Sequence, residues 1–301
     1  MASLKEVQSK ISGVKKTKQI TRAMNMVASS RLRGAQTAME AFRPYADKFS
    51  EVLGSLAEKA GDDASSPLFV PHDAVKNIHI VLCTSDRGLC GGFNNKLTDR
   101  AYEAVKEMSG EGVEISFTCF GKKGLRWCKK NNLPVWDEYI GVVGAKFGFD
   151  VAFKSGQSFI NSFLREACDE VYIIYSEFGG MSRQTPVLKK ILPIPPIEKE
   201  ETAAQQSTAE GAGYQAEHIC EPSPDELLGE MLPRNIYIQI YKALLETSTS
   251  EHAARMTAMD NATKACNDMI DELTLVYNKA RQAAITAELM DIVGGAEALR
   301  G

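Results

Sequence analysis

The chain has 301 residues, of which 44% are hydrophobic and 25% charged, and its formal net charge is -4. This composition is sufficient for a packed core and excludes an intrinsically disordered protein. No run of eighteen apolar residues occurs, and the first ten residues are too polar for a secretory signal peptide. We therefore expect a protein that does not span a membrane and that stays in the compartment where it is made.

The first sixty residues have the periodicity of one long helix. Between residues 3 and 59, apolar side chains recur at steps of three and four, as in Leu4, Val7 and Ile11. A helix of this length would extend for roughly 80 Å, more than a small globular domain can cover. The single proline, Pro44, is expected to bend it.

The middle of the chain alternates between strand and helix patterns, which predicts a parallel α/β sheet. Strands are expected at residues 77–83, 113–120, 135–140 and 170–178, with an edge strand near 186–192. Helices are expected at residues 94–108, 122–131 and 156–167. Residues 197–216 are rich in Glu, Ala, Gln, Ser and Thr and predict a flexible excursion.

A second long helix is expected near the carboxyl end. Ser223 or Asp225 can cap its first amide groups. After Pro233, helical spacing continues without proline or glycine as far as Gly294, which corresponds to roughly 90 Å. Gly294 and Gly295 are expected to end or fray the helix.

These two helices are expected to pair with each other, because each has only a narrow apolar stripe to bury. The intervening segment must close on itself as a domain, so we predict an antiparallel, left-handed coiled coil. Small residues would allow close approach of the two backbones. They are Ala23, Ala28, Ser29, Ser30, Gly34 and Ala35 on the first helix, against Ala280, Ala283, Ala284 and Ala287 on the second.

The loop at residues 84–94 follows the first strand, at the sheet edge where α/β folds often bind ligands. It lacks both the dinucleotide-binding glycine spacing and the Gly-Lys-Ser/Thr of a phosphate loop. Ser85 and Asp86 have no histidine in a similar strand-end loop to act as a base, since His79 lies inside a strand. We interpret the loop as a structural turn or a docking surface and expect no catalytic residue.

Cysteine and histidine spacing gives no support to a metal site. Seven cysteines and four histidines are scattered along the chain, and no Cys-x-x-Cys pair occurs. Reduced thiols are the simplest interpretation for an odd number of cysteines in a chain of this length. We expect neither a metal nor a cofactor.

Charge is concentrated at the amino end. The first 36 residues contain eight basic side chains and one acid, Glu6. The basic residues are Lys5, Lys10, Lys15, Lys16, Lys18, Arg22, Arg31 and Arg33. Such asymmetry usually indicates a polyanionic surface nearby, and an acidic protein fits better than nucleic acid because stacking aromatics are absent. A merely solvated helix face, a coiled-coil adaptor for nucleic acid and an enzyme built on the α/β domain remain as alternatives.

Four blocks of sequence resemble the gamma subunits of bacterial F-type ATP synthases. They are Ile-Thr-Arg-Ala-Met-Asn-Met-Val-Ala at 20–28, Thr-Ser-Asp-Arg-Gly-Leu-Cys-Gly-Gly at 84–92, Ser-Glu-His-Ala-Ala-Arg-Met at 250–256 and Leu-Val-Tyr-Asn-Lys-Ala-Arg-Gln at 275–282. The resemblance implies an α/β protein in which a Rossmann-like domain is inserted between the two helices of a long antiparallel coiled coil. The corresponding division is 1–60 and 223–301 for the helices and 75–222 for the domain.

The resemblance further implies a central-stalk rotor subunit of a proton-translocating ATP synthase, with no active site of its own. Rotation of the membrane ring would be coupled through it to conformational change at the catalytic subunits. The implied partners are the alpha and beta subunits of the catalytic ring, the epsilon subunit and the c-ring, with no nucleic acid. The paired-cysteine insertion of chloroplast relatives and a transit peptide are absent, which favours a peripheral protein at the cytoplasmic face of a bacterial inner membrane.

The resemblance also assigns three groups of contact residues. Those implied to contact the catalytic ring are Arg22, Met24, Arg255, Arg281, Gln282, Thr286 and Glu288. The implied bearing tip consists of Leu289, Ile292 and Val293. Glu221 is placed at the foot that meets the membrane ring or the epsilon subunit, beside His218 and Cys220.

Overall fold

A computed structural model of the chain describes residues 4–60, 66–72, 74–195 and 223–298. The chain divides into two compact units. Unit 1 consists of the residues up to Ser30 and from Arg255 onward, and unit 2 consists of Arg31–Ala254. Two long helices, α1 (Leu4–Ala60) and α5 (Pro224–Ala298), each contribute to both units.

Both terminal helices predicted from periodicity are confirmed, although α5 extends further than expected. The Ser223 hydroxyl accepts the amide N–H of Glu226 at 3.3 Å, so the expected cap is present. The expectation that Gly294 and Gly295 end α5 is wrong, because the helix continues through both glycines to Ala298, and the alternative that they fray it stays a prediction. Each glycine costs only about 1 kcal/mol of helix propensity, and extending an existing helix needs no new nucleus. The helix α1 runs through Pro44, and the bend expected there stays a prediction.

Unit 2 contains a five-stranded sheet in the order β3-β2-β1-β4-β5. The strands β1 to β4 run parallel, and β5 is an antiparallel edge strand beside β4. This order reverses between β1 and β4, as in doubly wound folds, and the α/β class is confirmed. The strands are β1 (Asn77–Cys83), β2 (Glu114–Phe120), β3 (Val135–Tyr139), β4 (Glu170–Phe178) and β5 (Gln184–Leu192).

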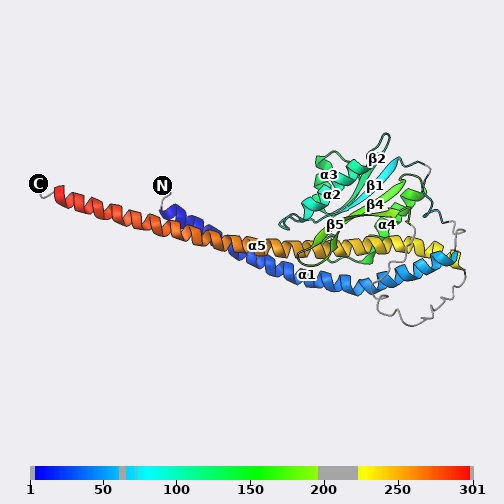
Figure 1. Cartoon of the computed structure of the whole chain (residues 1–301), viewed down its shortest axis with the longest axis horizontal. Helices are drawn as coiled ribbons and strands as arrows, with labels where there is room; N and C mark the ends of the chain where they lie inside the picture. The colour runs from blue at the N-terminus through cyan, green and yellow to red at the C-terminus, as the bar shows by residue number, and fades with distance from the viewer. Residues whose placement is uncertain (1–3, 61–65, 73, 196–222, 299–301) are drawn as a thin grey trace, which may run out of the picture. The chain divides into compact units, whose positions relative to one another are not determined.

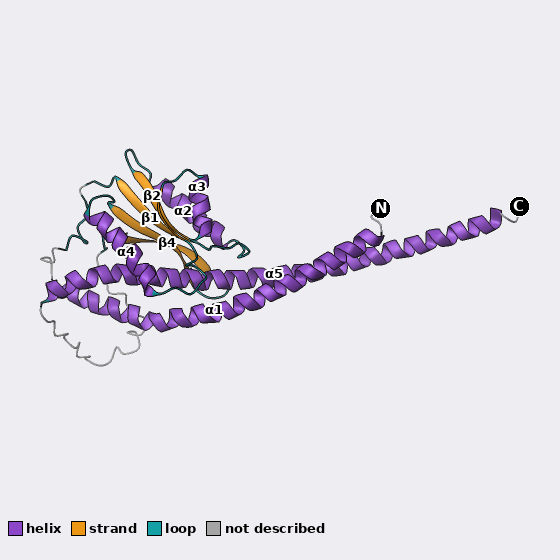
Figure 2. Cartoon of the chain, turned by 180° about the vertical axis from the view of Figure 1, so that it is seen from behind, coloured by secondary structure: helices purple, strands orange, loops and turns teal. Residues whose placement is uncertain are grey.

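Helices cover both faces of this sheet (Figure 1 and Figure 2). On one face, α2 (Phe93–Met108) and α3 (Lys122–Lys130) pack against residues such as Ile80 and Leu82. On the other face, α4 (Phe149–Leu164) and the first part of α5 enclose a second core with Val81 and Ile173. The end of α1 joins this second core through Leu53 and Leu56.

The helix α4 begins seven residues before the position predicted from the sequence. The prediction used Gly156 as a boundary, but Gly156 lies inside the helix. A side chain there would collide with the ring of Tyr237 on α5, so the glycine marks a close approach of two helices rather than a helix end.

Candidate functional site: the paired terminal helices

The two helices of unit 1 meet along a regular seam. Its members on α1 are Leu4, Val7, Ile11, Val14, Lys18, Thr21, Asn25 and Ala28, which are buried or half-buried. Its members on α5 are Met259, Thr263, Cys266, Ile270, Leu273, Tyr277, Ala280 and Ala284. Both series alternate steps of three and four residues, which is the heptad pattern of a left-handed coiled coil.

Two polar contacts establish that the pair is antiparallel. The hydroxyl oxygens of Thr21 and Thr263 are hydrogen-bonded at 2.8 Å. Four residues further along α1, the Asn25 side-chain amide donates to the carbonyl of Met256 at 2.8 Å. A step forward on α1 is therefore a step backward on α5. Polar groups within an apolar seam select one register, because any slide of the helices would separate them.

This register corrects the predicted pairing of small residues. Residues 23–35 of α1 lie opposite the part of α5 that precedes Thr263, not opposite Ala280 and Ala284. Ala23, Ala283 and Ala287 are exposed, whereas Ala280 and Ala284 do belong to the seam. Periodicity identifies the face of a helix that packs, but successive heptads look alike, so it does not specify how far one helix slides along the other.

The predicted ring-contact residues fall into two groups along the paired helices. Met24 and Arg255 are half-buried and adjoin the bonded pair Asn25 and Met256, so the structure brings them to one level, next to exposed Arg22. The second group lies further along α5. It consists of Arg281, Gln282, Thr286 and Glu288, all exposed. Contact of these residues with a partner stays a prediction.

The predicted tip residues are exposed apolar side chains. Leu289, Ile292 and Val293 have 57%, 67% and 57% of their surface exposed. They follow Ala284, the last seam position, and all α5 residues from 285 to 296 are exposed. Glu221, His218 and Cys220 lie outside the described residues, as does the segment 197–216.

The basic side chains at the amino end of α1 face solvent. Seven of the eight are exposed, and Lys18 is half-buried in the seam. Lys10 forms an ion pair with Glu6 at 3.3 Å, one helical turn away. Both side chains of this pair are more than half exposed, so screening by water keeps the pair weak. The positive surface is thus available to an acidic partner.

The loop after β1 uses its polar side chains to hold the α/β fold together. The Asp86 carboxylate accepts the backbone N–H of Lys122, at the start of α3, at 3.0 Å. Its other oxygen accepts the N–H of Gly141 at 2.9 Å. The Ser85 hydroxyl donates to the carbonyl of Arg87 at 2.7 Å. These contacts support the structural interpretation of the loop.

His79, the histidine nearest to this loop in sequence, is a core residue. Burial lowers the pKa of His79 to about 3, so its ring is neutral near pH 7. One ring nitrogen is hydrogen-bonded to Ser116 at 2.8 Å and the other to Thr118 at 2.9 Å. The ring also stacks on Trp136, with 4.4 Å between centroids. His79 is therefore engaged by β2 and is not oriented toward Ser85.

The sequence indicated no contact or structural role for a polar segment of α5, residues 246–252. All seven residues from Glu246 to His252 are buried, although none of them is apolar. A polar run of this kind on a long helix is normally a solvated face. The signal that could have identified it is the predominance of Ser and Thr, whose short hydroxyl side chains can bond to backbone groups nearby.

The described part of the chain contains neither a membrane-spanning helix nor a cluster of metal ligands. Among the described residues, no helix is long and apolar enough to cross a membrane. In the same part of the chain, no three His, Cys, Asp or Glu side chains are grouped so that they could hold a metal ion.

Comparisons with known proteins extend over nearly the whole chain. A family model described as ATP synthase matches residues 3–299. The ATP synthase gamma chain of Desulfosudis oleivorans is 66% identical over 302 residues, covering 100% of both chains. That of Desulforapulum autotrophicum is 62% identical, covering 99% of this chain and 100% of its own. The fold is similar to a chain in the cryo-EM structure of the Euglena gracilis mitochondrial ATP synthase rotor, with a TM-score of 0.61 and 18% identity, covering 94% and 98% of the two chains.

Proposed function

Because this chain belongs to the ATP synthase family, and within it to the gamma chains, we propose that it is the central-stalk rotor subunit of a proton-translocating ATP synthase. The observation that carries the proposal is the continuity of α5. One end of this helix lies in the core of the α/β unit, and the other end is one of the two helices of the coiled coil.

A rotor acts through differences between its faces. The coiled coil of unit 1 presents a basic surface on α1 and a mixed, partly apolar surface on α5. Each catalytic subunit around such a shaft meets a different surface at a given angle. Differential binding to the shaft shifts each subunit toward a different conformation, and rotation moves that preference from one subunit to the next.

The proposed ring contacts come from the family resemblance, and the chemistry of these side chains fits that role. Arg22 and Met24, with Arg255 across the seam, offer one contact level on the shaft. Arg281 offers a second level, together with Gln282, Thr286 and Glu288. Guanidinium groups bind carboxylates through paired hydrogen bonds, so an acidic surface on the ring subunits is the fitting partner.

The end of α5 is proposed to rotate inside an apolar bearing. Leu289, Ile292 and Val293 are exposed apolar side chains beyond the last seam position, which a partner would remove from water. Apolar contact has little directional preference and therefore opposes rotation weakly. The proposed foot at Glu221 would meet the membrane ring or the epsilon subunit.

The proposed partners are the alpha and beta subunits, the epsilon subunit and the c-ring, with no nucleic acid among them. The chain would be peripheral to the membrane through this complex, at the cytoplasmic face of a bacterial inner membrane. We retain 1–60, 75–222 and 223–301 as the proposed domain division.

The decisive experiment is co-expression of this chain with the alpha and beta chains of the same organism. Stoichiometric assembly and a large stimulation of ATP hydrolysis are expected when the chain is present. A ring that hydrolyses ATP equally well without it, or that does not retain it, would overturn the proposal.

The contact assignment has a matched test on α5. Arg281→Ala should slow turnover of the assembled complex by about tenfold, the usual loss for a charge-assisted hydrogen bond. Lys279→Ala removes a neighbouring exposed charge that we do not place at the contact. An unaltered rate for Arg281→Ala, or equal losses for both variants, would remove Arg281 from the contact surface.

A further inference from the structure

The strand β4 extends beyond its parallel neighbour. It pairs with β1 only from Glu170 to Ile174, although it continues to Phe178. On its other side, β5 pairs with it as far as Phe178. On the side that faces β1, the backbone groups of the last residues of β4 therefore have no neighbouring strand to pair with among the described residues.

Side chains of α5 bind this edge. The N–H of Ser176 donates to the Thr247 hydroxyl at 3.4 Å, and the Ser250 hydroxyl donates to the carbonyl of Ser176 at 3.2 Å. Both backbone groups of Ser176 thus bond to one helix. Thr247 and Ser250 are fully buried, and Ser176 is 2% exposed. Buried backbone groups left without such partners would be costly, so these bonds are strongly favoured.

A third hydroxyl of the same helical turn holds a different segment. The N–H of Gly144, which lies between β3 and α4, donates to the Ser248 hydroxyl at 3.3 Å. Gly144 has a φ of +80°, and a side chain there would collide with the Glu251 carboxylate. This turn of α5 is therefore fitted against two separate parts of the α/β unit.

The turn lies where the strand order reverses, between the carboxyl ends of β1 and β4. Doubly wound proteins usually bind their ligands in this crevice. Here α5 crosses it: Leu244 belongs to the core under α4, whereas Ala254 packs against the core under α2 and α3. The helix occupies the position of a ligand.

Hydrogen bonds at this place add a directional restraint to that of apolar packing. Apolar side chains hold α5 through the shape of a close-packed core, and no single apolar contact depends on the angle between two bonded groups. Hydrogen bonds weaken steeply when donor and acceptor become misaligned. Hydroxyls bonded to backbone groups of a sheet therefore resist rotation of the helix relative to that sheet.

We propose that Thr247, Ser248 and Ser250 are positioning residues that lock α5 against rotation, the first and last to the sheet and Ser248 to the loop between β3 and α4, so that torque passes from the α/β unit into the coiled coil. This inference rests on the proposed rotor function. In this proposal, the crevice in which related folds bind a ligand holds the helix α5 in a fixed orientation.

The first test uses the isolated chain and two variants at one position. Thr247→Val keeps the shape and removes the hydroxyl, whereas Thr247→Ser keeps the hydroxyl and removes a methyl group. Hydrogen exchange at the Ser176 amide should become about fivefold faster in Thr247→Val, the loss expected for one hydrogen bond. In Thr247→Ser it should stay close to wild type. Equal exchange in wild type and Thr247→Val would overturn the proposed bond.

The second test uses the assembled complex. With Thr247→Val, ATP synthesis at a limiting ion gradient should fall about fivefold, whereas ATP hydrolysis without a gradient stays within about twofold. Thr247→Ser should restore synthesis. A merely structural role would lower both rates together. That outcome, or equal impairment by Ser and Val, would refute a role in torque transfer.

A third variant guards against a folding defect at position 247. Ser248→Ala removes only the bond to Gly144 and should show the same selective loss of synthesis under load. If the wild-type chain does not assemble or stimulate hydrolysis, the rotor proposal fails on its own test. The exchange experiment still decides whether the hydroxyls hold the strand edge.

Discussion

The two stretches of α5 bury their side chains in different ways. In unit 2, Ile236, Ile240 and Leu244 are completely buried, and even polar residues after them are shielded from water. In unit 1, only a single seam of the helix is covered, and residues 285–296 are exposed. Burial stabilises the first stretch, whereas helix propensity and one narrow seam maintain the second.

The difference in burial between the two stretches of α5 bears on the proposed function. In unit 2, α5 is enclosed on nearly all sides, whereas in unit 1 most of its surface is available to a partner. For the proposed rotor, the exposed stretch is the surface that ring subunits can bind. The buried stretch is the part that must keep its position relative to the sheet.

The largest expected contrast comes from one kind of substitution in both stretches. Leu244→Ala should lower the free energy of unfolding by about 2–5 kcal/mol, because it opens a cavity in a closed core. Leu289→Ala, at a side chain that is 57% exposed, should change it by less than about 0.5 kcal/mol. Urea unfolding followed by tryptophan fluorescence measures both. Similar losses for the two variants would contradict the comparison.

The seam of unit 1 can be tested with adjacent alanines. Ala284→Asp places a charge at the seam and should cost about 1–2 kcal/mol of stability, with lower coupled ATP synthesis. Ala283→Asp adds the same charge at an exposed position and should be nearly neutral. Thermal unfolding followed by circular dichroism compares them. If Ala284→Asp leaves melting and coupling unchanged, the seam does not extend this far.

The buried and exposed stretches of α5 should also differ in how pH affects stability, because Glu246 is a buried carboxyl. Burial raises its pKa, with a smaller contribution from Glu177, while Lys242 and Arg43 oppose the shift. A carboxyl with a raised folded-state pKa destabilises the fold once it is ionised. Its cost is absent below the unfolded-state pKa and grows as pH rises through the raised value. Glu246→Gln should therefore stabilise the protein at neutral pH and lose this advantage in acid.

The control for Glu246 lies in the other stretch of the same helix. Glu272 is exposed in unit 1, so Glu272→Gln makes the same substitution without changing a buried group. Urea unfolding at a series of pH values distinguishes the two. A Glu246→Gln advantage that persists at the acid end would show that the effect is not ionisation.

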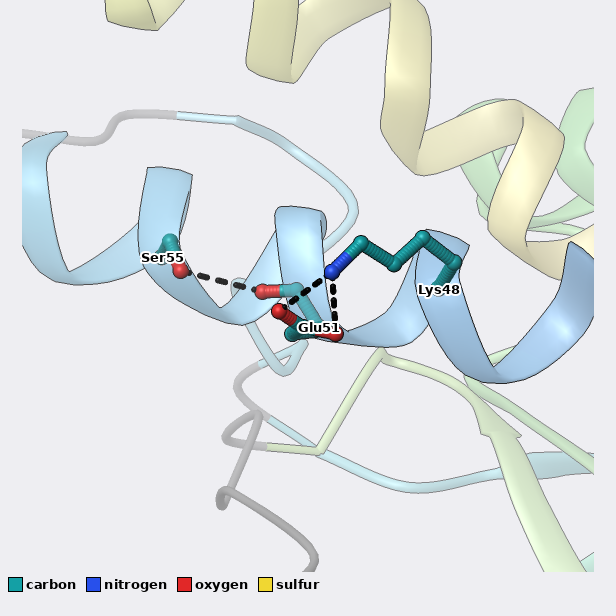
Figure 3. Close-up of polar contacts among 3 residues, drawn as sticks. All are labelled: Lys48, Glu51 and Ser55. Carbon is teal, nitrogen blue, oxygen red and sulfur yellow. Dashed lines mark hydrogen bonds and ion pairs between the residues drawn. The ribbon is translucent and has the colours of Figure 1, made fainter. Parts of the chain in front are cut away.

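The smallest effect is expected on the solvent side of unit 2. Figure 3 shows Lys48 bonded to both oxygens of Glu51, at 2.7 and 2.8 Å, and the Ser55 hydroxyl donating to the Glu51 carbonyl at 3.1 Å. The ion pair is more than half exposed. Lys48→Ala should change stability by less than about 0.5 kcal/mol and less still at high salt. A larger loss would mean that this face is not simply solvated.

Much of the architecture was predictable. The long helices follow from steps of three and four, and the strand β1 follows from a short, mainly apolar run in which His79 is the interruption, because the sequence pattern reports local burial directly. The start of α4 was not predictable from Gly156, since the reason for that glycine is Tyr237 on a distant helix. The contact residues came from resemblance, and exposure of Arg281 or Leu289 shows only that they are accessible.

The sequence by itself determined the order of helices and strands and that the two ends of the chain would pair, although it did not give the start of α4 or the end of α5. Only the tertiary structure decided the register of that pairing, set by Thr21 against Thr263, and the burial of the polar turn around Thr247. The physical reason is that periodicity is a local property, repeated identically along a helix. A hydrogen bond between distant residues depends on where the rest of the chain places its partner.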